Sequence, residues 1–250
     1  MKKKYNFYMH FLSFTLVVNA KINNVLYDII IKKIKKKSHK IIKYYFKTNS
    51  EYCLQIGCGN NVLSNWLNSD IDPMNDEILF LDASEKFPFD NDVFQFVFSE
   101  HLIEHLHFEG VINLLKESYR TLKIGGVLRI ATPDLDFLHK IYQSPHEIYN
   151  QNYVKWALNS FLKNISNSQF SNTEINHIYV INNFHKDWGH QIIFTYETLE
   201  FLLKVIGFRN VSRKEIGKSK YNKLTGVERH SKSIPNQFNE METMVIEALK

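Results

Sequence analysis

The sequence predicts a doubly wound α/β domain with a mostly parallel sheet. Two observations support this prediction. Short apolar runs alternate with helical or turn-forming segments from residue 51 onward, and a glycine-rich turn directly follows the first run. Such alternation builds a parallel sheet with helices on its faces. A chain of 250 residues is long enough for one such domain with extensions.

Five apolar segments are the expected strands of the first half of this domain. In chain order they are residues 51–56, 66–71, 77–81, 93–99 and 127–131. Residues 108–122 carry apolar side chains at the helical period, and Gly125 and Gly126 are expected to stop that helix. The interval between Gly59 and Asp70 is short, so the first crossover helix is expected to have two turns at most.

The alternation breaks after residue 134. Residues 135–185 are rich in Asn, Ser and Tyr and contain no glycine, which predicts a helical insertion. We interpret residues 135–190 as a lid or substrate pocket over the cleft.

The last third of the chain contains weaker signals. Residues 195–206 predict a helix with Thr195 as its N-cap and Gly207 at its end, followed by a strand at 208–216. Residues 223–228 are a candidate for one more strand. We interpret residues 231–250, which are polar, as a peripheral tail, so that the domain covers 51–230.

The basic charge is concentrated at the N-terminus. Residues 1–50 hold twelve Lys and one Asp, a net charge of +11, whereas the other 200 residues hold 19 basic and 25 acidic groups, a net charge of −6. We therefore interpret residues 1–50 as a basic amphipathic extension. Its segment 22–47 predicts a helix that either lies on an anionic membrane surface or packs on the domain.

Two features bear on the compartment. The apolar stretch 7–18 has twelve residues, too few for the roughly 20 that span a bilayer, although its flanks resemble a signal peptide. Cys53 and Cys58 fit neither a disulfide framework nor a zinc knuckle. Together with a nucleotide-type site downstream, these features predict a cytoplasmic protein, with peripheral contact to the inner membrane face as an open option.

The glycine turn favours a cofactor without phosphates. Its frame is Gly57-Cys58-Gly59-Asn60-Asn61-Val62, and a dinucleotide fingerprint needs a third glycine where Val62 stands. The Gly-Lys-Ser/Thr ending of a P-loop is also absent from this turn. A nicotinamide oxidoreductase is therefore disfavoured.

Five sequence blocks together carry a family resemblance. They are Leu54-Gln55-Ile56-Gly57-Cys58-Gly59, Asn68-Ser69-Asp70-Ile71, Leu81-Asp82-Ala83 with Phe87-Pro88-Phe89, Ser99-Glu100-His101-Leu102-Ile103-Glu104-His105-Leu106, and Leu122-Lys123-Ile124-Gly125-Gly126-Val127-Leu128. Their order and spacing resemble class I S-adenosylmethionine-dependent methyltransferases, of the type 11-like branch that acts on small molecules and the cell envelope. The resemblance implies a Rossmann-like sheet of seven strands, an enzyme, and S-adenosyl-L-methionine as cofactor.

The resemblance also implies roles for single residues. Asp70 is expected to bind the ribose hydroxyls and Asp82 the adenine amino group, while the glycines let the backbone approach the methionine part. The expected cofactor-binding residues are Gln55, Gly57, Cys58, Gly59, Asp70, Ile71, Asp82, Ala83, Ser99 and Glu100. Four positions depart from the family: Gln55 replaces a usual acidic residue, Asn61 a frequent glycine, Gln95 a frequent Asp and Ile124 a proline.

Three residues are candidates for catalysis. His101 and then His190 are candidates for a general base, which is needed only if the acceptor is a hydroxyl or a protonated amine. Asp134 is a candidate for orienting the substrate. The alternatives are a supporting hydrogen bond for His101 and a helix cap for Asp134.

His101 and His105 are four residues apart, so a helix would present them on one face, with Glu104 beside them, as candidate metal ligands. A third protein ligand is not evident in this segment, so we predict no metal site. Glu104 and His105 are expected to cap or brace the following helix.

The predicted function is methyl transfer to a small-molecule acceptor, either a saccharide or a lipid-linked intermediate. An RNA-directed methyltransferase and a cofactor-binding scaffold without catalysis are the alternatives. Nucleic acid is disfavoured as a partner because few aromatic residues interleave the lysines at 32–43. The sequence makes no prediction of the oligomeric state.

Overall fold

The computed structural model describes residues 37–250, apart from the side chain of Ser231. Residues 37–48 form a helix, as predicted for the end of the segment 22–47; the rest of that segment and the apolar stretch 7–18 lie outside the described residues. The chain divides into two compact units after Thr48. Across the described residues, no helix is both long and apolar enough to cross a membrane.

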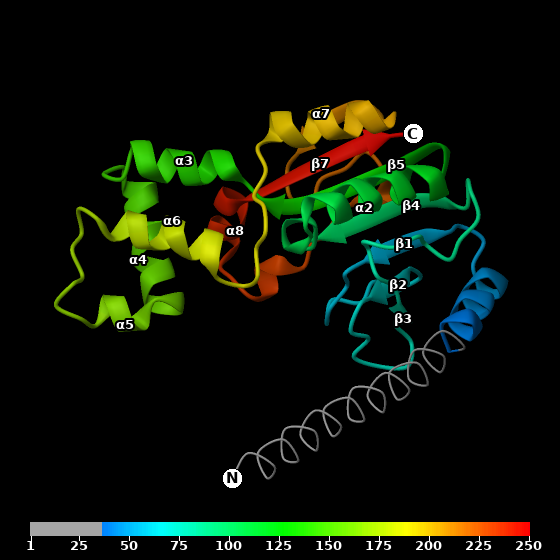
Figure 1. The fold of residues 1–250 in the computed structure, drawn as a ribbon, viewed down its shortest axis with the longest axis horizontal. Coiled ribbons are helices and arrows are strands. Elements are labelled where there is room, and N and C mark those ends of the chain that lie inside the picture. The colour runs from blue at the N-terminus through cyan, green and yellow to red at the C-terminus, as the bar shows by residue number, and fades with distance from the viewer. Residues whose placement is uncertain (1–36) are drawn as a thin grey trace, which may run out of the picture. The chain divides into compact units, whose positions relative to one another are not determined.

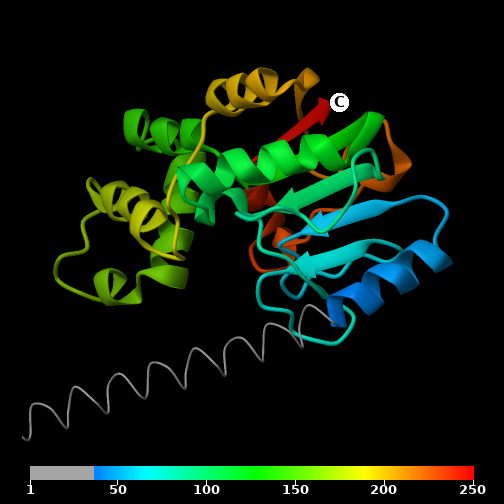
Figure 2. The ribbon, with the colours of Figure 1, turned by 45° about the vertical axis from the view of Figure 1, so that its right-hand side comes forward.

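A seven-stranded sheet forms the centre of residues 49–250 (Figures 1 and 2). Its strands are β1 (Cys53–Ile56), β2 (Leu67–Asp70), β3 (Leu79–Phe80), β4 (Phe94–Glu100), β5 (Leu122–Pro133), β6 (Arg209–Lys214) and β7 (Thr243–Leu249). The order is β3-β2-β1-β4-β5-β7-β6, and only β7 runs antiparallel to its neighbours. The strand order reverses between β1 and β4, where α/β proteins bind their ligands. The predicted fold class is confirmed.

Two helices cover one face of the sheet. α2 (Phe108–Thr121) joins β4 to β5, and α7 (Tyr196–Ile206) leads into β6. α7 begins at the predicted N-cap, where Thr195 Oγ1 accepts a hydrogen bond from the N–H of Thr198, and it ends at Gly207. The two helices contact each other as well as β5, β6 and β7 (Figure 1).

The predicted insertion is helical. Between β5 and α7 it contains α3 (Leu135–Gln143), α4 (Ile148–Phe161), α5 (Lys163–Ser166) and α6 (Asn176–Lys186). These helices share an apolar cluster with Phe238 of α8 (Asn236–Glu242) that includes Phe137, Tyr153 and Phe184. Figure 1 shows the insertion beyond the carboxyl ends of β4 and β5, where the site is expected. Its role as a lid stays a prediction.

The predicted short helix after Gly59 was wrong. Residues 57–66 form only turns, and Asn68 of β2 holds them in place of a helix. Asn68 Oδ1 accepts a hydrogen bond from Leu63 N–H at 2.9 Å, and its Nδ2 donates to the carbonyls of Leu63 and Trp66 at 3.0 and 3.1 Å. The indole of Trp66 packs edge-on against Phe98 of β4. Trp66 and Leu63 therefore cover the sheet where a crossover helix was expected.

Residues 215–230, here called the strap, lie on the face of the sheet that Trp66 and Leu63 also cover. Leu224 and Val227 of the strap pack against Cys53 of β1 and Phe96 of β4. The strap contains a short 3-10 turn at Asn222–Leu224 and no strand, so the predicted strand at 223–228 was wrong.

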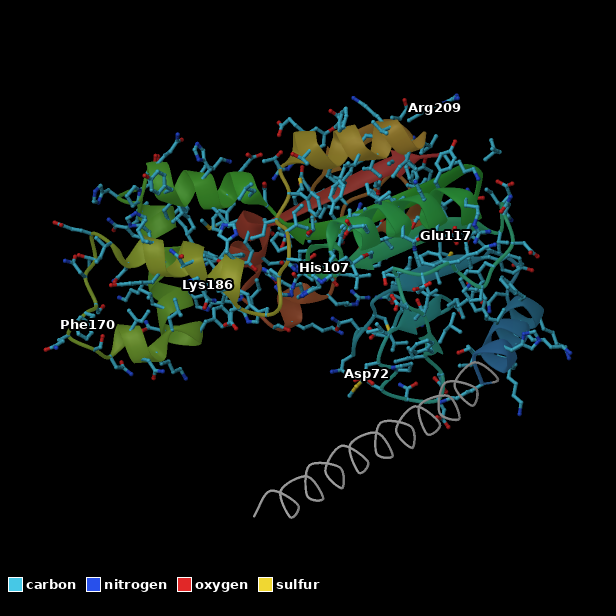
Figure 3. The ribbon with its side chains drawn as sticks, in the orientation of Figure 1. Asp72, His107, Glu117, Phe170, Lys186 and Arg209 are labelled. Atoms are coloured by element: carbon cyan, nitrogen blue, oxygen red, sulfur yellow. The ribbon has the colours of Figure 1, made fainter. Side chains whose placement is uncertain are left out.

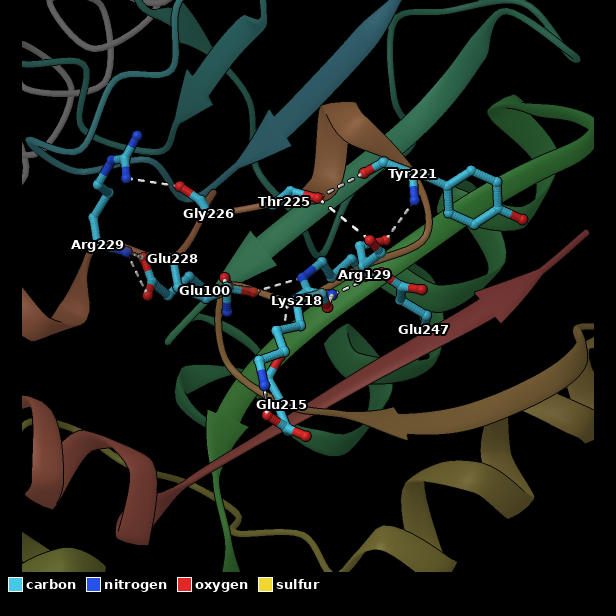
Figure 4. A network of polar contacts seen from close by, with 12 residues as sticks. Glu100, Arg129, Glu215, Lys218, Tyr221, Thr225, Gly226, Glu228, Arg229 and Glu247 are labelled. Carbon is cyan, nitrogen blue, oxygen red and sulfur yellow. Dashed lines mark hydrogen bonds and ion pairs between the residues drawn. The ribbon is translucent and has the colours of Figure 1, made fainter.

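A buried arginine holds the strap to the sheet (Figure 4). Arg129 of β5 is fully buried; its Nε donates to Glu228 at 2.5 Å and its Nη1 to Glu247 at 2.6 Å. Nη1 also donates to the carbonyl of Lys218 at 3.0 Å, and Glu228 accepts a hydrogen bond from the N–H of Gly217 at 2.9 Å. One guanidinium therefore joins three parts of the chain: β5, β7 and the strap.

The interpretation of residues 231–250 as a peripheral tail was wrong. β7 lies between β5 and β6 and is buried along almost its whole length. The prediction rested on the polar composition of the segment, yet the charge of Glu247 is matched by Arg129 inside the protein.

Replacing Arg129 by Met is expected to lower the free energy of unfolding by about 3–5 kcal/mol, because Glu228 and Glu247 remain buried without a countercharge. Urea denaturation followed by circular dichroism measures this loss. The matched control is Arg209→Met on the exposed surface of β6, which should change stability by less than about 0.5 kcal/mol. Equal stability of the two variants would contradict the role given to Arg129.

Candidate functional site

The glycine turn after β1 has two different glycines. Gly57 has φ 70° and Gly59 has φ 49°, a region that other residues rarely adopt. A Cβ on Gly57 would lie 3.0 Å from the side chain of Leu102, whereas a Cβ on Gly59 would meet no atom within 4 Å. Gly57 therefore serves close packing, and Gly59 leaves its backbone open to a ligand.

Asp70 joins this turn to the end of β2. Its Oδ2 accepts a hydrogen bond from Gly59 N–H at 2.8 Å, and its Oδ1 accepts one from Asp72 N–H at 2.9 Å. The N–H of Cys58 donates to the carbonyl of Ser69 at 3.0 Å. Each carboxylate oxygen keeps a further lone pair, so Asp70 can still accept hydrogen bonds from ligand hydroxyls.

Asp82 and Ala83 lie one strand further along the same edge. Asp82 Oδ1 accepts hydrogen bonds from the N–H and the Oγ of Ser84 at 2.9 and 2.5 Å. Asn113 of α2 donates to the carbonyls of Ala83 and Glu85 at 3.0 and 2.8 Å. α2 therefore fixes the turn that contains Asp82, the residue predicted to bind the adenine amino group.

Two buried polar atoms beside the glycine turn have no partner among the described residues. They are Gln55 Oε1 on β1 and Ser99 Oγ on the adjacent β4. Gln55 Nε2 donates to the carbonyl of Asn61 at 3.1 Å, which fixes the side chain against the turn. An unpaired buried polar atom costs about 1–3 kcal/mol and calls for a ligand or water to complete it. These residues fit a polar cofactor.

Cys58 and Ile71 contribute differently from the polar residues. Burial, followed by the charge of Asp70, raises the pKa of Cys58 to about 12, so its thiol stays neutral and packs behind the turn. Ile71 follows Asp70 and is 59% exposed, an apolar surface at the edge where the adenine is expected.

Glu100, a predicted cofactor ligand, has another task. Its carboxylate accepts hydrogen bonds from the backbone N–H groups of Arg229 and His230, each at 2.9 Å (Figure 4). The end of the strap is thereby tied to the carboxyl end of β4. The prediction that Glu100 binds the cofactor finds no support in this geometry.

His101 follows Glu100 with φ 46°, an uncommon conformation for a non-glycine residue. Its Nδ1 lies 3.0 Å from Glu104 Oε1 and its Nε2 3.5 Å from Thr243 Oγ1. Burial lowers the pKa of His101, but the hydrogen bond and charge of Glu104, together with Glu100 and Glu242, outweigh burial and raise it. With both nitrogens engaged, His101 matches its alternative role as a supporting residue.

His230 was missed by the sequence analysis. Its ring stacks on His101 with 3.8 Å between ring centroids, and its Nε2 lies 3.4 Å from Glu242 Oε1. The other oxygen of Glu242 accepts a hydrogen bond from Tyr153 of the insertion. The side chain of His230 is 27% exposed against 17% for His101. No local motif predicts a role for His230, because its stacking on His101 joins residues far apart in the chain.

His190, the second predicted base, joins Glu104 and His105 in a separate group. Their ligating atoms lie within 4.8 Å of one another. Burial lowers the pKa of His190, whose Nδ1 lies 2.7 Å from the carbonyl of Phe184.

Glu104 was expected to cap or brace the following helix, but it does not cap it. The N-cap of α2 is His107, which Figure 3 labels at the start of that helix. Glu104 is fully buried and accepts hydrogen bonds from Thr132 of β5 at 3.0 Å and from His101. Burial raises the pKa of Glu104, but the hydrogen bond and charge of His101 outweigh it and lower the pKa.

Asp134, the third predicted catalytic residue, is occupied by the fold. Its Oδ1 accepts a hydrogen bond from Asp136 N–H at 3.0 Å, which caps α3, and its Oδ2 pairs with Arg213. The capping alternative is the one observed. Both oxygens of Asp134 therefore serve the fold, and its side chain is buried at 3% exposure.

A groove of about 500 Å³ lies at the end of β6, away from the glycine turn. It is lined by Arg213, Lys214, Glu215, Lys218, Ser219 and Lys220. We place the site at the ends of β1, β2 and β4 instead, because the glycine turn and the unpartnered oxygens of Gln55 and Ser99 lie there and not in this groove.

Comparison with known families agrees with this geometry. The profile of the family described as "Methyltransferase domain" matches residues 30–213, most of the chain. The chain belongs to this methyltransferase family: it is an enzyme, and the cofactor of the family is S-adenosylmethionine. A search of curated proteins found no matching relative.

Several solved structures are similar over most of this chain. A methyltransferase from Archaeoglobus fulgidus is 19% identical, covers 87% of this chain and 94% of its own, and has a TM-score of 0.45. A chain of the Haloferax volcanii complex of the Trm112 activator with a methyltransferase is 12% identical, with coverages of 87% and 91% and a TM-score of 0.47. Phosphoethanolamine N-methyltransferase 2 from Haemonchus contortus, solved with S-adenosylmethionine, is 16% identical, with coverages of 86% and 52% and a TM-score of 0.39.

Proposed function

We propose that this enzyme methylates a hydroxyl group of a small molecule, either a saccharide or a lipid-linked intermediate. The observation that carries the proposal is the His101–His230 pair with Glu242 at the carboxyl edge of the sheet. A hydroxyl acceptor has to lose a proton during transfer, and a partly exposed histidine beside a carboxylate serves that need.

The cofactor is held at the same edge in this proposal. Asp70 would accept hydrogen bonds from the ribose hydroxyls, and Asp82 would accept one from the adenine amino group. Gln55 and Ser99 would satisfy their unpaired oxygens on the methionine part, which lies against the open backbone of Gly59. The bound sulfonium supplies a methyl group that is already activated for transfer.

His230 would act as the base and His101 as a positioning residue. His101 is fixed by Glu104 and Thr243 and presents its ring face to His230. Glu242 would hold the ring of His230 in place through Nε2, and Tyr153 donates a hydrogen bond to the other oxygen of Glu242. Tyr153 thus links the insertion to Glu242 and, through Glu242, to His230.

The charge distribution supports a small-molecule acceptor over RNA. Residues 51–250 carry a net charge of −6, which repels phosphate. The lysines of the N-terminal segment favour a place in the cytoplasm at the inner membrane face, where a lipid-linked acceptor would be within reach. A scaffold without catalysis would need no histidine pair of this kind.

Asp70→Ala is expected to weaken binding of S-adenosylhomocysteine at least tenfold, because a hydrogen bond to a charged group contributes about 1.5–3 kcal/mol. Calorimetric titration of the full chain measures this affinity. Asp72→Ala is the matched control, since Asp72 is exposed two residues away and should bind like wild type. Unchanged affinity in Asp70→Ala would remove Asp70 from the site.

Methyl-labelled S-adenosylmethionine is expected to label a saccharide or lipid fraction in the presence of the enzyme. With the acceptor in hand, His230→Ala should lower the transfer rate about 10²–10⁴-fold with cofactor affinity preserved. His139→Ala, on the exposed side of α3, is the control. Label found only in RNA would favour the RNA alternative, and cofactor binding without transfer to any fraction would favour a scaffold.

A further inference from the structure

We propose that Glu104, His105 and His190 form a site for a divalent metal of the zinc class. The carboxylate and imidazole atoms of these residues lie within 4.8 Å of one another. Two imidazoles and one carboxylate are a donor set that zinc accepts, with a fourth position left for water or another ligand. This proposal replaces the prediction of no metal and does not depend on the identity of the acceptor.

The hydrogen bonds around the group prepare it for coordination. His190 Nδ1 lies 2.7 Å from the carbonyl of Phe184, so Nδ1 carries the proton and Nε2 presents a free lone pair. Metal-bound histidines characteristically donate their second N–H to an oxygen in this way. Glu104 is oriented by Thr132 and His101, which leaves lone pairs on both oxygens.

The backbone before His190 is bent to bring that ring to the site. Trp188 has φ 57° and Gly189 has φ 80°, two consecutive left-handed residues. A Cβ on Gly189 would lie 3.8 Å from His105 Nδ1, so the turn faces the His105 ring directly. The N–H groups of Gln191 and Ile192 donate to the carbonyl of Glu104 at 2.7 and 3.2 Å, which holds the two segments together.

The rearrangement that coordination needs is small. Ligands bound to one zinc at about 2.0–2.2 Å lie roughly 3.3 Å from one another, so the side chains would close by about 1.5 Å at most. Rotation about side-chain bonds provides this, since His105 and His190 are only partly buried. The ion would clamp the end of the insertion to the turn after β4, one hydrogen bond away from His101.

The test is titration of chelator-treated full-length protein with Co²⁺ and Zn²⁺, without cofactor or acceptor. We expect one equivalent of Co²⁺ to bind with the strong visible absorption of a low-coordinate site, and Zn²⁺ to displace it. At a hundredfold excess over its dissociation constant, Zn²⁺ should raise the melting temperature by roughly 5 °C or more.

His105→Ala and His190→Ala should each lose the absorption band and the thermal shift. His105→Asn serves as a second, milder variant, and circular dichroism establishes that each variant is folded. The matched control is His107→Ala, because His107 is exposed in the same segment and lies outside the group. Absence of binding to wild type, or equal binding by His107→Ala and a folded His105→Asn or His190→Ala, would overturn the proposal.

Discussion

The buried guanidinium of Arg129 is the interaction on which the rest of the structure depends. A buried charge on a central strand is tolerated only when it is paired, and Glu228 and Glu247 pair it from two other segments. That pairing places the strap on the sheet, and the strap in turn delivers His230 to His101. The candidate base therefore owes its position to the ion pair between Arg129 and Glu228, two residues before His230.

The strap also covers part of the sheet that has no crossover helices. Residues 57–93 connect β1, β2, β3 and β4 without any helix, so one face of the sheet lacks its usual cover. Trp66 and Leu63, held by Asn68, cover part of this face, and Leu224 and Val227 of the strap pack in the same apolar cluster.

The sequence predicted what is encoded locally and missed what is assembled over distance. The glycine turn, Asp70, Asp82 and the capped helix from Thr195 each have a short signature that needs no partner elsewhere. The structural contacts of Glu100, Asp134 and β7 have no such local signature, because their partners lie some 80 to 130 residues away: Arg229 for Glu100, Arg213 for Asp134 and Arg129 for Glu247. A charged residue inside an apolar run, such as Glu247, is a signal that favours a buried ion pair as much as an exposed segment.

The placement of the cofactor at the carboxyl edge of the sheet can be tested by hydrogen exchange of the full chain with and without S-adenosylhomocysteine. We expect slower exchange of backbone amides at residues 57–61, 70–72, 82–85 and 99–101 when the ligand is bound. Protection confined to the groove at residues 213–220, with these four segments unchanged, would contradict it.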